Sequence, residues 1–165
     1  MPKRRLTVTG STTTVRYNVT VWDSDDIADC STHAYGTAMI RFLGAHPCRS
    51  AHRVLATLPL NGRTVALSAI TTSFPGTPAD PYGTTEMFIK LEQADGTGAV
   101  NDLLREGGTL PGANAIPSDE AFSVVSQDAG VTVFDAWYLT GRTMDQAPAL
   151  VKLEQDLFLT PFTSA

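Results

Sequence analysis

Residues 30–52 read CSTHAYGTAMIRFLGAHPCRSAH, and they hold both cysteines and all three histidines of the 165-residue chain. Between the cysteines lies an apolar segment with helical spacing. This segment ends at Gly44, a typical residue after a helix, and Pro47 prevents the helix from resuming. The pattern predicts that a helix separates the two cysteines, and the residue at which this helix begins decides whether they can meet.

The residues before Cys30 predict an early start for this helix. Ser24 is a good N-cap, and the aspartates beside it complement the positive end of a helix dipole. A straight helix from this point would hold the two cysteines too far apart, because bonded cysteines have Cα atoms about 4.4–6.8 Å apart. A disulfide therefore requires the helix to start late, near His33 or Ala34, or to be broken at Gly36.

Three interpretations of the cysteines and histidines remain open at this point. The cysteines can be small buried side chains beside unrelated polar histidines, they can form a disulfide, or they can bind zinc. Thiolate and imidazole are suitable ligands for tetrahedral zinc, but a helix would hold the two halves of the cluster apart unless it is short or a second subunit contributes. The candidate zinc ligands are Cys30, His33, His46, Cys48 and His52.

The rest of the chain shows two hairpins and three further helical segments, of which the one over residues 100–106 has only one or two turns. Two β-type runs flank Asn61-Gly62, the strongest short signal for a hairpin. The other expected elements are a strand over residues 6–9, an alternating strand over 14–22, a hairpin over 122–126 and 131–139, and helices over 84–93, 100–106 and 148–159.

This order of elements predicts a single α+β domain over residues 1–165, with residues 1–5 as a flexible tail. We expect a ferredoxin-like, two-layer sandwich, in which helices cover one face of an antiparallel sheet. An extra strand at the N-terminus and an extra helix at the C-terminus complete the expected fold.

Composition excludes some partners. The net charge is −5, and the only basic run, Lys3 to Arg5, lies at the N-terminus, so we expect no nucleic-acid partner. No segment approaches the roughly 18–20 apolar residues of a membrane span. The residues after Arg5 are polar, so we also expect no signal peptide or anchor in this chain; localisation is otherwise undetermined.

The motifs of common hydrolases are absent from the sequence, and Gly96-Thr97-Gly98 follows a helical run rather than the strand that a phosphate loop requires. We therefore expect a non-enzymatic binding or assembly domain without a cofactor. Exposed sheet edges would favour a homo-oligomer or a protein partner. The rival hypothesis is a small ferredoxin-like enzyme with a concave pocket and a titratable group of perturbed pKa. The residues expected to line that pocket are Trp22, His33, Tyr35 and Trp137.

Two segments, DCSTHAYG at 29–36 and FLGAHPCRS at 42–50, resemble the pattern DCxxHxYG…FLxxHPC of uncharacterised actinobacterial proteins. The segment DGTGAV at 95–100 resembles another part of the same group, so the similarity covers residues 20–106. Many members place this domain outside the membrane after an N-terminal anchor, which favours a disulfide over zinc and an extracytoplasmic location. The resemblance carries no known function.

On this basis we predict that Cys30 and Cys48 are paired. The helix would then begin after Cys30, with Ser31 or Thr32 as its cap and His33 in its first turn.

Overall fold

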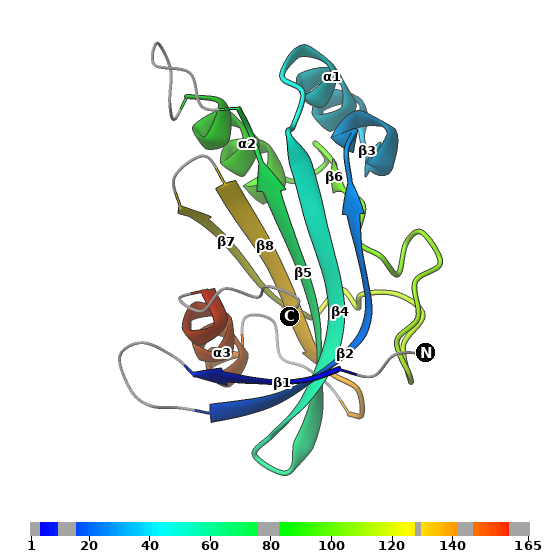
Figure 1. The fold of residues 1–165 in the computed structure, drawn as a ribbon, viewed down its shortest axis with the longest axis vertical. Helices are drawn as coiled ribbons and strands as arrows, with labels where there is room; N and C mark the ends of the chain where they lie inside the picture. Colours follow the sequence, from blue (N-terminus) through cyan, green and yellow to red (C-terminus); the bar gives the residue numbers. More distant parts are fainter. Residues whose placement is uncertain (1–3, 10–15, 76–82, 128–129, 142–146, 159–165) are drawn as a thin grey trace.

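The fold, described here from a computed structural model, is built on a six-stranded antiparallel sheet with the strand order β1-β2-β4-β5-β8-β7 (Figure 1). The structure describes residues 4–9, 16–75, 83–127, 130–141 and 147–158. The strands of the large sheet are β1 (Arg4–Thr9), β2 (Arg16–Ile27), β4 (Ser50–Leu60), β5 (Arg63–Ser73), β7 (Ala121–Gln127) and β8 (Gly130–Tyr138). A small second sheet pairs β3 (Ala34–Tyr35) with β6 (Ala99–Val100), and the helices are the 3-10 turn η1 (Cys30–His33), α1 (Thr37–Ala45), α2 (Gly83–Gln93) and α3 (Pro148–Phe158).

The central hairpin is confirmed. Strands β4 and β5 pair from Ser50–Ser73 to Leu60–Arg63 without a shift of register. At the turn, Asn61 and Gly62 both have positive φ, 51° and 77°, as a type I′ turn requires. The second expected hairpin, β7 with β8, is also present, although its turn at 128–129 lies outside the described residues.

The predicted early start of the first helix is wrong. Ser24 and the aspartates beside it lie in β2, which continues to Ile27 after a bulge between Val21 and Asp23. Neighbouring strand β4 explains this outcome, because Asp25 lies opposite Arg53 and Asp26 opposite His52. Cross-strand partners for the carboxylates outweigh the local preference for a helix cap.

The α+β class and the antiparallel sheet are confirmed, but the ferredoxin-like topology is not. A ferredoxin-like sheet contains split βαβ units, whose helix-linked strands are parallel with another strand between them. Here β2 and β4, which are linked through α1, are direct antiparallel neighbours, and so are the strands of each hairpin.

Helices lie on both faces of the sheet, so the expectation of one covered face is wrong. Alternate residues of β4 separate the two sides: Val54 and Ala56 pack in the cluster formed with α3, whereas Leu55 packs on the opposite face. That opposite face is covered by α1, α2 and the connection after β6. Figure 1 shows α1 and α2 together at one end of the sheet and α3 towards the other.

The connection after β6 is not the helix that its composition predicts. Residues 103–107 form turns, and Leu103 and Leu104 are buried against the sheet with Trp137. None of the helices in the described part of the chain has the length and apolar character to cross a membrane.

Helix α3 covers its face of the sheet with Leu150, Leu153 and Leu157, all buried. Among them lies an acid, Glu154, which is only 1% exposed. The hydroxyl of Ser123 donates a hydrogen bond to its Oε1 at 3.0 Å, and its Oε2 has no partner. Burial, opposed by the Ser123 hydrogen bond, raises the pKa of Glu154 to about 8.

We predict that Glu154→Gln makes stability less sensitive to pH. In the wild type the folded state resists ionisation of Glu154, so stability is full below the unfolded pKa near 4.3 and falls as the pH rises towards about 8. The slope attributable to this residue is about 1.4 kcal/mol per pH unit. Urea unfolding at pH 5, 6.5 and 8 should show Glu154→Gln gaining several kcal/mol over the wild type at pH 8. The exposed-site control, Glu86→Gln, should follow the wild type; a Glu154→Gln profile parallel to the wild type would contradict the prediction.

Candidate functional site

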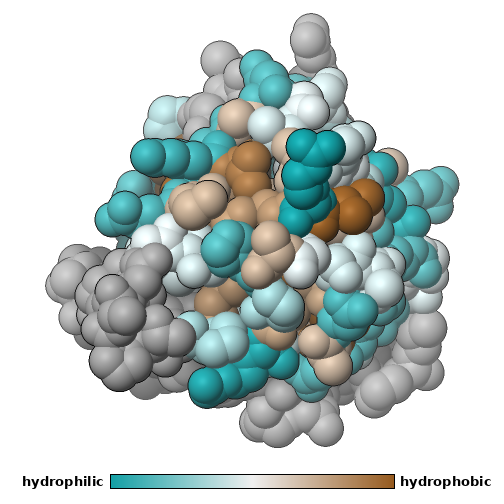
Figure 2. All heavy atoms as spheres, turned by 90° about the horizontal axis from the view of Figure 1, so that it is seen from above, coloured by the Kyte–Doolittle hydropathy of each residue, from teal (hydrophilic) through white to brown (hydrophobic). Residues whose placement is uncertain are grey.

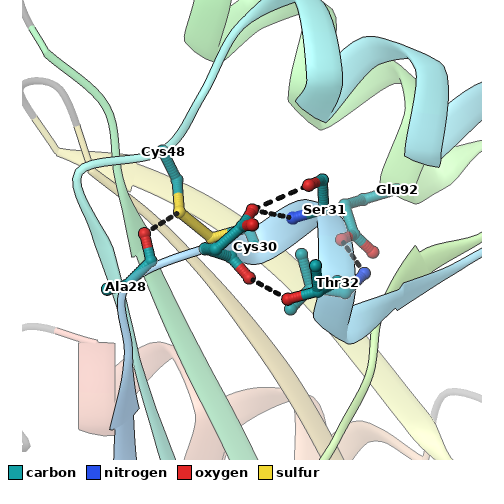
Figure 3. The surroundings of a disulfide bond; sticks show 8 residues. Ala28, Cys30, Ser31, Thr32, Cys48 and Glu92 are labelled. Atoms are coloured by element: carbon teal, nitrogen blue, oxygen red, sulfur yellow. Dashed lines mark hydrogen bonds between the residues drawn. A yellow bond between two sulfur atoms is a disulfide. The ribbon is translucent and has the colours of Figure 1, made fainter.

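A disulfide joins Cys30 to Cys48, as predicted (Figure 3). The Cα atoms are 6.0 Å apart, and both side chains are buried in the cluster formed by α1, α2 and the end of the sheet. The bond is possible because the helix begins only at Thr37, after Gly36 with its positive φ of 86°. The predicted caps are therefore wrong: Asp29 caps η1 by accepting from the backbone N–H of Ser31 at 3.1 Å.

The zinc interpretation does not fit. Both sulfur atoms are used in the disulfide, and no group of three or more potential metal ligands occurs among the residues that the structure describes. The histidines have separate surroundings. His33 Nδ1 lies 2.8 Å from Glu106 Oε1, His52 Nδ1 lies 2.9 Å from Asp26 Oδ1, and His46 packs against the ring of Phe42.

A buried arginine connects η1, the sheet and the connection after β6. Arg53 of β4 is 2% exposed and donates two hydrogen bonds to the carboxylate of Asp25, at 2.8 and 2.6 Å. Its Nη1 donates to Glu106 Oε1 at 2.8 Å and to the carbonyl oxygen of Asn101 at 3.0 Å. Glu106 also accepts from the Asn101 side chain and contacts His33. Burial alone would raise the pKa of Glu106, but these hydrogen bonds lower it to about 2.

Beyond the antiparallel pair of β3 and β6, the backbones of two glycines lie in close contact, and this contact is here called the β3–β6 crossing or glycine crossing. A Cβ on Gly98 would overlap the carbonyl oxygen of Tyr35, and a Cβ on Gly36 would overlap the backbone of Gly98. Both residues also have positive φ. Glycine is therefore required on both sides of this crossing.

Beside this crossing lies a cleft of about 580 Å³, a size within the usual range for ligand pockets. The sheet supplies its apolar floor through Ile70, Phe122 and Val133. The end of α2, the β3–β6 crossing and two connecting segments form its walls. Of the described residues that line the cleft, five are acidic and one is basic; the acids are Glu92, Asp95, Asp102, Glu120 and Asp135.

The electrostatics of the cleft are set by burial and by like charges. Burial first, and then the negative charges of Glu120 and Asp102, raise the pKa of Asp135 well above its ordinary value. Burial also raises the pKa of Glu92 to about 8, although the backbone N–H of Val100 donates to its Oε1 at 3.3 Å. The cleft therefore holds two carboxyl groups with raised pKa values, and Glu92, with a pKa of about 8, keeps its proton near neutral pH.

One of the four residues predicted to line a pocket does so. Tyr35 lines the cleft, with the guanidinium of Arg105 3.8 Å above its ring. Trp137 and Trp22 belong instead to the apolar cluster under the connection after β6, and the Trp22 indole donates to Thr57. His33 contacts Glu106.

The residue that the sequence analysis missed is Asp135. In the alternating strand 131–139, every second side chain points to the same face of the sheet. Asp135 therefore shares a face with Val131 and Val133, which are buried, and the alternation places a carboxylate among inward-facing positions. An acid at such a position is the signal that could have indicated the site.

The end of the molecule near α1 and α2 carries exposed apolar side chains. Figure 2 shows hydrophobic residues near the centre of this end, with hydrophilic residues around them. The large hydrophobic side chains that are exposed in the described structure are Tyr35, Ile40 and Met87.

Comparisons with known proteins add no further assignment: no family model, no curated protein and no solved structure matches this chain. The resemblance to actinobacterial proteins therefore stays a prediction.

We predict that Gly98→Ala disrupts the wall of the cleft while Gly96→Ala does not. Both glycines have positive φ, 96° and 78°, so both substitutions carry the backbone cost of about 1 kcal/mol. Only at Gly98 does the new methyl group meet backbone atoms; nothing lies within 4 Å of it at Gly96. Thermal unfolding should show a loss for Gly98→Ala at least about 2 kcal/mol larger than for Gly96→Ala. Equal losses would mean that the strands do not cross as closely as described.

Proposed function

We propose that this chain is a non-enzymatic binding domain and that its ligand occupies the acidic cleft. The observation that carries the proposal is the cleft itself, which combines an apolar floor with acidic side chains that converge on it. This combination is typical of sites that bury a small molecule or a side chain. The Cys30–Cys48 disulfide supports an extracytoplasmic location for this binding, because such bonds persist in oxidising compartments.

A fragment screen tests this proposal without knowledge of the natural ligand. The probes are small cationic, neutral and anionic compounds at millimolar concentration, detected through shifts of backbone amide signals in NMR spectra. We expect the shifts to cluster at residues 94–100, 122 and 133–135, which surround the cleft.

Ser118→Trp should abolish these shifts, because the exposed Ser118 lines the cleft and a large ring there would fill it. The matched control is Ala115→Trp, an exposed position on the same segment that does not line the cleft. Hits that survive Ser118→Trp, or the absence of any hit at the cleft, would count against a binding function there.

A second candidate function is a small enzyme that uses a carboxylic acid of the cleft as a general acid. The observation that favours it is the pKa of Glu92, about 8, because general acids work best with a pKa near the operating pH. The two candidates differ in outcome: a bound ligand is recovered unchanged from a binding domain and converted by an enzyme.

Self-association is the remaining part of the binding and assembly hypothesis. Strands β1 and β7 form the two edges of the large sheet, and edge strands can pair with another chain. The exposed side chains of Ile40 and Met87 would add apolar contact area to such an assembly. Light scattering at micromolar concentration distinguishes a monomer from a homo-oligomer.

A further inference from the structure

We propose that the cleft binds the cationic end of its ligand, an alkylammonium or guanidinium group, with Asp135 as the counter-ion. This inference rests on the proposed binding function and names the chemistry of the ligand. The same group could come from a free amine or from a lysine or arginine side chain of a peptide, and the experiment below separates these sources.

Asp135 is the group that a cation would meet at the bottom of the cleft. In the sheet it lies between Ser68 on β5 and Phe122 on β7, and Ile70 and Val133 line the floor beside it. No hydrogen bond to its carboxylate is found within the described part of the chain. Asp135 is partly exposed, at the cleft. A carboxyl group without a hydrogen-bond partner in such surroundings is costly to ionise, and a ligand that brings a positive charge reduces this cost.

The acidic side chains around Asp135 all raise its pKa. Glu120 and Asp102 act on it from the connecting segments, whereas Glu92 of α2 and Glu154 of α3, each with a pKa of about 8, add negative charge only as the pH rises towards that value. Asp95 adds a further carboxylate to the wall. The one basic residue among the described lining residues, Arg105, has its guanidinium on the ring of Tyr35. The potential in the cleft therefore attracts cations.

The shape of the cleft favours an organic cation over a metal ion. A calcium ion takes six to eight oxygen ligands at about 2.3–2.6 Å, whereas no close group of three potential ligands exists among the described residues. The carboxylates are instead distributed around a cleft of about 580 Å³ with an apolar floor. An alkylammonium ion has a charged end for Asp135 and a carbon chain for Ile70 and Val133.

Binding of this kind is coupled to the release of a proton. The raised pKa of Asp135 means that its carboxyl group keeps its proton to a higher pH than an ordinary aspartate, and a bound cation would lower that pKa, so cation binding is coupled to the loss of protons from this group. The affinity should therefore rise with pH, by up to about tenfold per unit, until the raised pKa of Asp135 is passed.

Isothermal titration calorimetry tests the inference with four probes. Butylammonium, butan-1-ol and butanoate share a four-carbon skeleton and carry a positive, a neutral and a negative polar group, and acetyl-Gly-Lys-Gly-amide presents an ammonium group on a peptide. We expect butylammonium to bind at least tenfold more tightly than butan-1-ol and butanoate, with an affinity that increases from pH 6 to pH 8. Titrations in two buffers of different ionisation enthalpy should show a net release of protons when the cation binds.

The variant Asp135→Asn should weaken butylammonium binding at least tenfold and remove the proton release. Its fold should be retained, because asparagine closely matches the neutral acid in shape. Asp119→Asn makes the same change at a residue that does not line the cleft, and it should bind within twofold of the wild type. A peptide that binds more tightly than butylammonium indicates a protein partner as the source of the cation; the reverse order indicates a free amine.

The outcomes separate this inference from the proposed function. Binding of butan-1-ol or butanoate as tight as that of butylammonium would overturn the cationic ligand and leave the cleft as a binding site. Equal butylammonium affinity in Asp135→Asn and the wild type would also overturn it. No binding of any probe, together with no hit at the cleft in the fragment screen, would overturn both proposals.

Discussion

The acidic cleft depends on the guanidinium of Arg53. This side chain is buried in the sheet and reaches three parts of the chain that are distant in sequence: Asp25 on β2, and Asn101 and Glu106 after β6. Glu106 extends the network to His33 on η1. A buried arginine must satisfy its donors, and only the observed path of residues 101–106 brings these acceptors to it. The wall of the cleft that carries Asp102 and Arg105 is therefore held by an interaction made outside the cleft.

The disulfide and the glycine crossing hold the adjoining wall, which β3 and β6 form, in the same way. Cys48 ties η1 to the segment that enters β4, and the backbone N–H of Asn101 donates to the carbonyl oxygen of His33 at 2.7 Å. Beyond this point β3 and β6 can approach closely only because Gly36 and Gly98 lack side chains. A covalent bond, a buried ion pair and a backbone contact thus converge on one short region, which fixes the position of Tyr35 above the cleft.

The sequence predicts the features of this protein that depend on local interactions. The β4–β5 hairpin follows from Asn61-Gly62, and α2 and α3 follow from their apolar spacing. The disulfide was predicted with the help of a resemblance. A break of the helix at Gly36 was one of the two conditions given for it, and α1 begins at Thr37, although the predicted caps Ser31 and Thr32 are wrong. These predictions succeed because turn type and helical periodicity are determined by residues that are close in the sequence.

The features that sequence analysis missed depend on contacts between distant segments. The local sequence around Asp25 predicts the N-terminus of a helix, but Arg53 lies opposite Asp25 on β4 and keeps it in a strand. Residues 100–106 have helical composition, but burial of Leu103 and the hydrogen bonds to Arg53 impose turns. The cleft could not be predicted for the same reason. Its carboxylates come from α2, β8 and two connections, and these segments lie side by side only because of the order of the strands in the sheet.

Hydrogen exchange of the variant Arg53→Lys tests most directly whether Arg53 holds the wall of the cleft. Lysine keeps the charge but cannot reach Asp25, Glu106 and Asn101 together. The account predicts a selective loss of protection at the amides of Asn101 and Glu106, which donate to His33 and Leu103, while Leu150 and Val151 in α3 exchange as in the wild type. Unchanged protection at Asn101 and Glu106, or an equal loss in α3, would contradict it.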